Sequence, residues 1–273
     1  TFPDLKDINI QTPLGLYMQS KLSHAVDEVR SSLDSYKFNE AASTLYRFVW
    51  MEFCDWGIEY SKASKESIVE LGSLFKETLK MVSPFMPFIS DYLYHKLSGT
   101  TLENGDSLMI MNFPKDIKKD ENIENMFSII EEAIISIRRA KTLIDMGNSK
   151  IEKAYLKLDV KIDEDVAKPF IEKLAKVENI EFVNSKVENS ITDVSNNLEV
   201  YIPTSAIDMK PIIEKLEKQQ EKAQKEFDKL NGMLSNERFV ANAPANVIEE
   251  NKKALEDVKS RLEKIEAELK SLA

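Results

Sequence analysis

Two series of apolar residues in the last quarter of the 273-residue chain repeat with the spacing of a coiled coil. The first steps by four and three residues from Met209 to Leu234, and the second steps by three and four residues from Leu255 to Leu272. Heptad spacing of this kind predicts two helices that each bury one seam against a partner helix. Because a short stretch joins them, residues 209–273 are predicted to form an antiparallel two-helix coiled-coil arm, roughly 40 Å long at the helical rise per residue.

The stretch between the two seams, LSNERFVANAPANVIEE, interrupts the helical pattern. Pro244 cannot continue a helix, and Asn242 and Asn246 are residues that typically end one helix and cap the next. We interpret this stretch as the tip of a helical hairpin, in which Phe239 and Val240 close the end of the apolar seam.

The first 150 residues carry several apolar series at helical spacing. Glycine is scarce, with seven residues in the chain, and the abundance of Leu, Lys, Glu and Ala favours helices. Residues 1–150 are therefore predicted to form a bundle of four or five helices, with a break at Pro84 and Pro87. The apolar series lie in residues 14–35, 39–62, 65–97 and 121–146.

After residue 150 the pattern changes from helical spacing to alternation. KAYLKLDVKI, NIEFVNSK and NNLEVYIP alternate apolar and polar residues as strands do, and EDVAKPFIEKLAKV between them has helical spacing. Residues 151–208 are therefore predicted to form a small β-α-β-β unit. The expected fold class is mainly α: a helical bundle, a small α/β unit and an antiparallel coiled-coil arm.

The charge of the chain is acidic and unevenly distributed. The net charge is −10, but residues 210–273 hold 13 basic and 13 acidic side chains, so all the excess negative charge precedes them. This balance argues against nucleic-acid binding over the whole surface and leaves only local contacts. With a single cysteine and no apolar run of about 18 residues, we expect a cytoplasmic protein without a disulfide or a membrane span.

No constellation of residues typical of catalysis is found in the sequence. The two histidines, His24 and His95, fall in different predicted helices, so a histidine-based metal site or triad is not expected. Cys54 lies beside Phe53 on an apolar helix face and is interpreted as a core thiol. There is no glycine-rich phosphate loop. Binding is therefore the more promising class of function.

Aromatic and basic residues are interleaved in the first two predicted helices, a composition that suits unpaired nucleotide bases. Rings stack on bases, while lysine and arginine contact phosphates. A place in the core is the alternative for most of these rings, and for Tyr17 and Lys21, one turn apart, both interpretations stay open. The residues concerned are Tyr17, Lys21, Arg30, Tyr36, Lys37, Tyr46, Arg47, Phe48, Trp50 and Trp56.

Three further features leave two interpretations open. RRAKT, Arg138 to Thr142, is either a nucleic-acid contact or a favourable charge near a helix end. The lysine stripe in residues 215–229 is either an RNA contact or a solvated face on which lysine and glutamate pair four residues apart. For Phe239 and Val240, RNA contact is the alternative to closing the seam.

Several motifs in the chain resemble those of valyl-tRNA synthetases, which are class I aminoacyl-tRNA synthetases. NEAA and FCDW within residues 36–62 resemble the family's anticodon-binding helical bundle, and MVSPFMPFISDYLYHKL resembles its next helix. LSNERFVANAPA resembles the tip of the family's C-terminal arm, and bundle, small α/β unit and arm follow the family's order. Two positions depart from the family pattern: Gly57 stands where Tyr is usual, and Tyr17 where Trp or Phe is more frequent.

This resemblance implies the tRNA-binding C-terminal region of a longer ligase, and TFPDLKDINI is expected to lie within that longer protein. The longer enzyme would use ATP to join valine to its tRNA, in a catalytic domain whose signatures this sequence lacks. We therefore expect no catalytic residue, metal or cofactor in the chain itself. The expected partners are valine tRNA and the catalytic domain of the same polypeptide, in a monomer that contacts no membrane.

The resemblance also implies candidate contact residues. In the bundle, which would hold the anticodon loop, Tyr17 is the candidate for stacking on a base, and Lys21 and Arg47 for contacting phosphates. The arm would contact the tRNA elbow, where the D and T loops meet. The elbow candidates are Lys222, Lys229, Arg238, Lys252 and Lys253. The alternatives are a coiled-coil protein-interaction module and the same tRNA-binding module from an isoleucyl-type sister synthetase.

Overall fold

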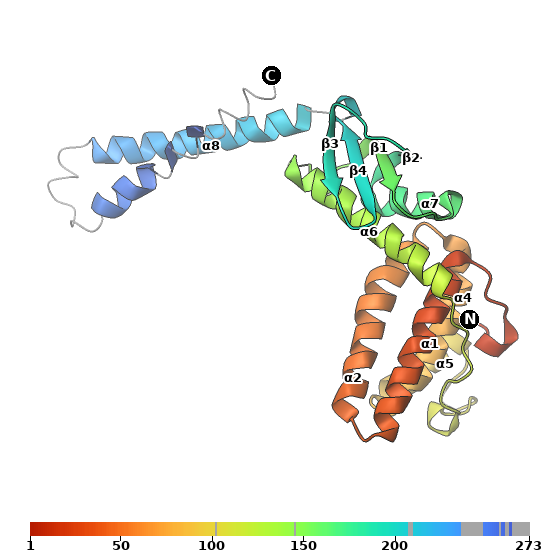
Figure 1. Ribbon diagram of the computed structural model, residues 1–273. Helices are drawn as coiled ribbons and strands as arrows, with labels where there is room; N and C mark the ends of the chain where they lie inside the picture. The colour runs from red at the N-terminus through yellow and green to blue at the C-terminus, as the bar shows by residue number, and fades with distance from the viewer. Residues whose placement is uncertain are drawn as a thin grey trace. The chain divides into compact units, whose positions relative to one another are not determined.

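The computed structural model describes residues 1–101, 103–144, 146–206, 210–235, 248–256, 258–259 and 262–263 (Figure 1). The chain divides into two compact units, Thr1–Thr204 and Ser205–Ala273. The described part is mostly helical, with one small four-stranded mixed sheet. None of the described helices is long and apolar enough to cross a membrane.

Helix α1 (Pro13–Asp34) is the central helix of the bundle. Its first turn is fixed by Thr12, whose hydroxyl oxygen accepts a hydrogen bond from the Gly15 amide at 3.0 Å, and Pro13 suits the first helical position. The predicted apolar face is confirmed, because most of its residues are buried: Leu14, Tyr17, Met18, Leu22, Ala25, Val26 and Val29. This face packs on the neighbouring helices and forms the centre of the core.

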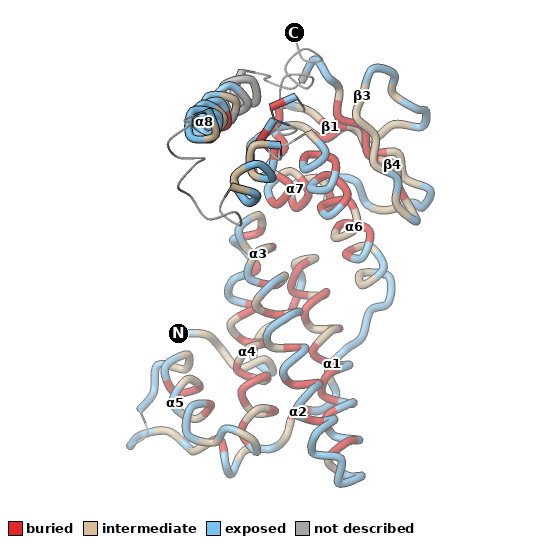
Figure 2. Tube along the Cα trace, turned by 90° about the vertical axis from the view of Figure 1, so that its left-hand side faces the viewer, coloured by how far each residue is buried: buried red, intermediate tan, exposed pale blue. Residues whose placement is uncertain are grey.

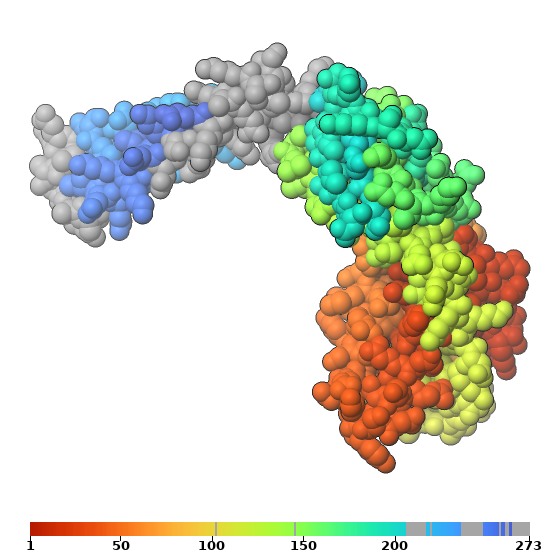
Figure 3. All heavy atoms as spheres, in the orientation of Figure 1, coloured from red at the N-terminus to blue at the C-terminus, as the bar shows by residue number. Residues whose placement is uncertain are grey.

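The second predicted helix is not regular along its length. It begins as α2 (Phe38–Tyr46), continues as the π-helix η2 (Arg47–Gly57) and ends as α3 (Ile58–Ser61). Helices α1 and α2 pack along each other, in red and orange in Figure 3. Gly57, at the end of η2, also lies close to α1, since a Cβ atom there would lie 3.3 Å from the Met18 sulfur. The departure from the family's tyrosine therefore coincides with a tight contact to α1.

The remaining helices of the bundle follow the predicted breaks. Helix α4 (Ile68–Val82) is preceded by the short η3 (Lys65–Ser67), and α5 (Pro87–Ser98) starts on its own proline. The predicted interruption at Pro84 and Pro87 is thus confirmed. Short 3₁₀ turns, η1 (Leu5–Asp7) and η4 (Leu108–Ile110), lie before α1 and after α5.

Helix α6 (Glu121–Leu143) closes the bundle and also supports the sheet. Asp120 caps it by accepting hydrogen bonds from the amides of Asn122 and Ile123, at 3.0 and 3.2 Å. The helix packs on α1, on β3 and β4, and on α7. Buried residues, in red in Figure 2, follow the sides of these helices that pack on other elements. The three domains predicted from the sequence, with boundaries at 150 and 208, stay a prediction.

The α/β part has one strand more than predicted. Its sheet has the order β2-β1-β4-β3, in which β1 and β2 are parallel and the other neighbours antiparallel. The additional strand, β3, contains the sequence SITDV, which is short, partly polar and placed at the sheet edge. The predicted β-α-β-β unit is therefore corrected to β-α-β-β-β. The elements are β1 (Ile151–Leu158), α7 (Glu164–Ala175), β2 (Val177–Phe182), β3 (Ser190–Val194) and β4 (Leu198–Pro203).

The second unit contains helix α8 (Lys210–Leu234) and helical residues within 248–263. Ala223, Val258 and Leu262 form a buried apolar cluster, and Phe227 and Leu230 pack against it. All five belong to the two heptad seams. The stretch interpreted as the hairpin tip, including Phe239, Val240 and Pro244, lies outside the described residues.

Candidate nucleic-acid interface

Lys21 and Arg47, the two predicted phosphate contacts of the bundle, line one surface cleft of about 350 Å³. Helix α1 contributes Lys21 and His24, and η2 contributes Arg47 and Glu52. The remaining lining residues are Ala25, on α1, and Glu124, on α6. The cleft therefore combines three basic with two acidic side chains from three helices.

The charged groups of the cleft are partly paired with one another. Arg47 Nη2 lies 2.5 Å from the Glu28 carboxylate, and its Nε lies 3.7 Å from that of Glu52. His24 Nε2 lies 3.0 Å from Glu124 Oε1, which also accepts a hydrogen bond from the Ser20 hydroxyl. About half of the Arg47 side chain stays exposed, so its charge is accessible from solvent.

Tyr17, the predicted stacking residue, is a core residue instead. It is only 5% exposed, and its ring stacks on Phe127 with centroids 4.3 Å apart and planes 10° from parallel. The hydroxyl donates a hydrogen bond to Glu131 Oε1 at 2.9 Å. Burial, followed by the charge of Glu131, raises the pKa of the Tyr17 hydroxyl. No ring face is left for a nucleotide base, and the prediction of stacking is wrong for this structure.

Exposed rings lie elsewhere on the same pair of helices. Tyr46 and Trp50 are 60% and 56% exposed, and their rings are 8° from parallel with centroids 6.4 Å apart. Tyr36 and Phe38, at the turn between α1 and α2, are also exposed and meet edge to face. Sequence reasoning grouped Tyr46 and Trp50 with the other rings. Tyr46 directly follows Leu45, which is buried, and neighbouring positions of a helix point to different sides.

The basic motif RRAKT, on α6, interacts with the C-terminal end of α7 and not with the end of its own helix. An Arg138 Nη atom donates a hydrogen bond to the Leu174 carbonyl oxygen at 2.9 Å, and Lys141 Nζ donates one to that of Ala175 at 3.0 Å. Both carbonyls lie in the last turn of α7, where positive charge is favourable. Burial, together with the charges of Lys176 and Arg138, lowers the pKa of Lys141 to about 8.

Four of the five elbow candidates fall within the described part of the second unit. Lys222 and Lys229 are exposed on α8, and Lys252 and Lys253 are exposed in the segment that begins at residue 248. Arg238 lies outside the described residues. On α8, Lys225 and Glu221 form an ion pair of 2.6 Å at a spacing of four residues, so part of the lysine stripe is paired on the helix surface.

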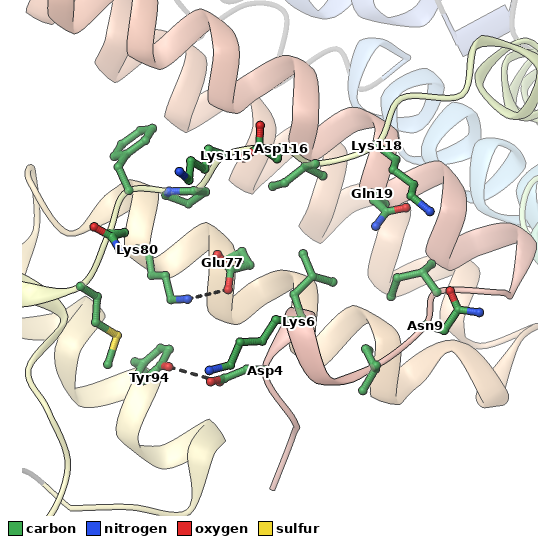
Figure 4. Close-up of a pocket in the computed structure, with 18 of the residues that line it drawn as sticks. Asp4, Lys6, Asn9, Gln19, Glu77, Lys80, Tyr94, Lys115, Asp116 and Lys118 are labelled. Carbon is green, nitrogen blue, oxygen red and sulfur yellow. Dashed lines mark hydrogen bonds and ion pairs between the residues drawn. The ribbon is translucent and has the colours of Figure 1, made fainter.

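Another cleft of the first unit, about 790 Å³, lies between the N-terminal segment, α1, α4, α5 and the loop before α6 (Figure 4). Its cations are balanced by nearby acids. Lys80 Nζ lies 2.6 Å from the Glu77 carboxylate, and the Tyr94 hydroxyl donates to Asp4 at 3.3 Å. This balance gives the cleft no excess of positive charge for a nucleic acid.

Among the described residues, no group of three or more His, Cys, Asp or Glu side chains is arranged to hold a metal ion. Cys54 is half-buried, and burial together with the charge of Asp55 raises the pKa of its thiol. A raised pKa disfavours the thiolate that a nucleophile needs.

Comparison with known proteins identifies both units. Residues 16–156 match the family described as the anticodon-binding domain of tRNA ligase, and residues 208–273 match the valyl tRNA synthetase tRNA binding arm. The valine–tRNA ligase of a Nitratiruptor species is 54% identical over 271 residues, which cover 99% of this chain and 31% of the relative. That of Wolinella succinogenes is 49% identical over 272 residues, covering 100% of this chain and 30% of the relative.

A more distant relative, the valine–tRNA ligase of Aquifex aeolicus, is 29% identical over 286 residues, covering 95% of this chain and 24% of the relative. The chain thus spans about a third or less of the length of these relatives. The cleft residues Lys21, Arg47 and Glu124 all fall inside the segment matched as an anticodon-binding domain. The chain therefore belongs to the valyl-tRNA synthetase family, of which it carries the anticodon-binding domain and the tRNA-binding arm.

Proposed function

We propose that this chain binds valine tRNA at two places, with the bundle on the anticodon loop and the second unit on the tRNA elbow. The observation that carries the proposal is the cleft in which Lys21 and Arg47 meet, inside the segment matched as anticodon-binding. In the longer polypeptide, ATP-dependent joining of valine to this tRNA would take place in a catalytic domain outside this chain. We expect the protein to act as a cytoplasmic monomer, without a cofactor bound to these residues.

For the anticodon loop, the cations of the cleft and the nearby exposed rings have separate tasks. Lys21 and the half-exposed Arg47 would neutralise phosphates. Tyr46 and Trp50, which replace Tyr17 as stacking candidates, offer accessible ring faces to unpaired bases. Tyr46 precedes Arg47 directly in the chain, so a ring and a cation are available at adjacent positions of one helix.

For the elbow, we propose that the second unit is an antiparallel coiled coil. The cluster of Ala223, Val258 and Leu262 supports this, because it joins the two heptad seams across the interruption. Helix α8 has 25 residues and is therefore roughly 38 Å long at the helical rise per residue. The exposed Lys222, Lys229, Lys252 and Lys253 are the proposed phosphate contacts, together with Arg238. Two moderate contacts on one chain strengthen each other when both engage together.

A salt titration of tRNA binding tests the proposal. Affinity should fall steeply with salt, and the logarithmic slope should decrease by roughly one for Lys21→Ala or Arg47→Ala. Lys62→Ala is a matched control, since Lys62 is exposed and pairs with Glu59 away from the cleft. Absence of binding, or affinity that ignores salt, would favour a protein-interaction module instead. Competition between valine and isoleucine tRNA tests the choice of tRNA.

Removing residues 210–273 tests the contribution of the second unit separately. The remaining residues contain the whole first unit, Thr1–Thr204, which has its own core. We expect this shortened chain to stay folded and to bind valine tRNA more weakly. Unchanged affinity would contradict the proposed elbow contact and leave the anticodon contact standing.

A further inference from the structure

Glu52 differs from the other acids around the cleft because no described residue donates a hydrogen bond to its carboxylate. Its side chain is 23% exposed, and its closest charged neighbour is Arg47 Nε at 3.7 Å, beyond hydrogen-bonding distance. Arg47 instead places Nη2 against Glu28, at 2.5 Å. Within the described part of the chain, no hydrogen bond to the Glu52 carboxylate is formed. A half-buried carboxylate of this kind keeps its acceptor sites available for a ligand.

The neighbouring carboxylates are already engaged. Glu124 Oε1 accepts a hydrogen bond from the Ser20 hydroxyl and contacts His24 Nε2 at 3.0 Å. Glu131, behind the cleft, accepts from the buried Tyr17 hydroxyl at 2.9 Å. Of the two acids that line this cleft, Glu52 is therefore the one to which no described residue donates a hydrogen bond, and Lys21 and Arg47 supply cations at its side.

This arrangement matches one class of nucleotide base. Cytosine, adenine and guanine carry an exocyclic amino group that donates hydrogen bonds, whereas uracil offers carbonyl acceptors in its place. A glutamate carboxylate accepts from such amino groups, and lysine or arginine donates to base carbonyls and ring nitrogens. In an anticodon loop the bases are unpaired, so these edges are free to enter a cleft.

We propose that this cleft takes one unpaired base with an exocyclic amino group, and that Glu52 accepts a hydrogen bond from that amino group. The assignment rests on the proposed binding of the anticodon loop and adds the residue that selects a base there. Lys21 and Arg47 hold the same nucleotide through its phosphate or its base acceptors. Glu52 is thus a specificity-determining residue, and the phosphate contacts supply most of the affinity.

The test uses the full 273-residue chain and a series of valine tRNA transcripts with one anticodon-loop base at a time replaced by uracil. Dissociation constants are measured at one fixed salt concentration. We expect one replacement of an amino-bearing base to weaken binding to the unaltered chain by about 5- to 150-fold. Glu52→Gln should reduce this difference to about twofold, because an amide also donates to uracil. Glu52→Ala should do the same by removing the acceptor.

Glu59→Gln is the matched control, since Glu59 lies on α3, pairs with Lys62 and does not line the cleft. This variant should keep the full selectivity. Thermal unfolding of each variant confirms that the bundle is intact. Selectivity that survives both Glu52 variants, or equal binding of all transcripts by the unaltered chain, overturns the assignment alone. Loss of all tRNA binding by the unaltered chain overturns the proposed function and the assignment with it.

Discussion

Lys76 Nζ lies 2.5 Å from Asp4 Oδ1, and the Lys76 side chain is only 4% exposed. The same ammonium group donates a hydrogen bond to the Phe2 carbonyl oxygen at 3.0 Å. Further along the segment, the Glu70 carboxylate accepts hydrogen bonds from the Gln11 and Thr12 amides, at 2.9 and 3.2 Å. Helix α4 thus holds the segment that precedes α1 by two charged side chains.

Asp4→Asn should destabilise the first unit by about 3–5 kcal/mol, because it leaves the buried Lys76 charge without its counter-ion. The free energy of unfolding is measured by urea titration. Glu59→Gln breaks an exposed ion pair to Lys62 and should cost about 0–1 kcal/mol. Equal losses for the two variants would show that the buried position of Lys76 has no energetic consequence.

The lowered pKa of Lys141 predicts that the free energy of unfolding rises with pH. Burial, with the charges of Lys176 and Arg138, lowers the pKa of Lys141 in the folded protein to about 8, from an ordinary value of 10.5. Between these values the unfolded chain binds more protons, so the free energy of unfolding should increase as pH rises through this range. The measurement is urea unfolding at several pH values from about 7 to about 10.

The matched variant for this prediction is Lys141→Met, which keeps a long apolar side chain but has no titrating group. The difference in unfolding free energy between the unaltered chain and the variant should increase with pH over the same range. A difference that stays constant would contradict the lowered pKa of Lys141. Other groups that titrate in this range cancel in the comparison.

Rings in the core and rings on the surface should respond oppositely to substitution. Tyr17→Phe removes the donor to Glu131, which should cost about 1–3 kcal/mol of stability and leave tRNA affinity unchanged. Trp50→Ala removes an exposed ring, which should weaken tRNA binding by about 1–3 kcal/mol with little change in stability. Unfolding and binding are measured on both variants. Weaker tRNA binding by a stable Tyr17→Phe variant would restore the original prediction for Tyr17.

Two glycines should respond to alanine with opposite signs. A Cβ atom at Gly15 would lie 1.8 Å from Glu70 Oε2 and 2.9 Å from Ile10 Cγ2, so Gly15→Ala must displace the carboxylate that holds Gln11 and Thr12. We expect a loss of stability and a lower melting temperature. Gly232 in α8 has nothing within 4 Å of such an atom, and Gly232→Ala should stabilise its helix by about 0.4–1 kcal/mol.

Much of the helical architecture follows from the sequence, since the apolar spacing and the two prolines already mark the boundaries of α1, α4, α5 and α6. Strand β3 was missed because an edge strand buries little, and SITDV therefore shows no clear alternation. The π-helical turns of η2 were also missed, because apolar spacing does not distinguish a π-helical turn from an α-helical one.

The site was predicted only in part. Lys21 and Arg47 were identified from residue type, and the fold supplies what the sequence does not, namely that they share a cleft with Glu52. Tyr17 was misplaced because a ring beside a lysine has the same pattern whether it is exposed or stacked on Phe127. The Arg138 and Lys141 contacts join residues 36 and 34 positions apart, which spacing within one helix does not reveal.

Helix α6 belongs to the bundle through α1 and to the sheet through β3 and β4. If either the bundle or the sheet unfolded, α6 would expose the apolar residues that it buries against that part. The same helix would then be a less stable support for the part that remains folded. We therefore expect neither part to have an independent melting transition, and residues 1–204 should unfold in a single cooperative step. A tRNA bound only to the bundle would accordingly protect backbone amides of the sheet from hydrogen exchange as well.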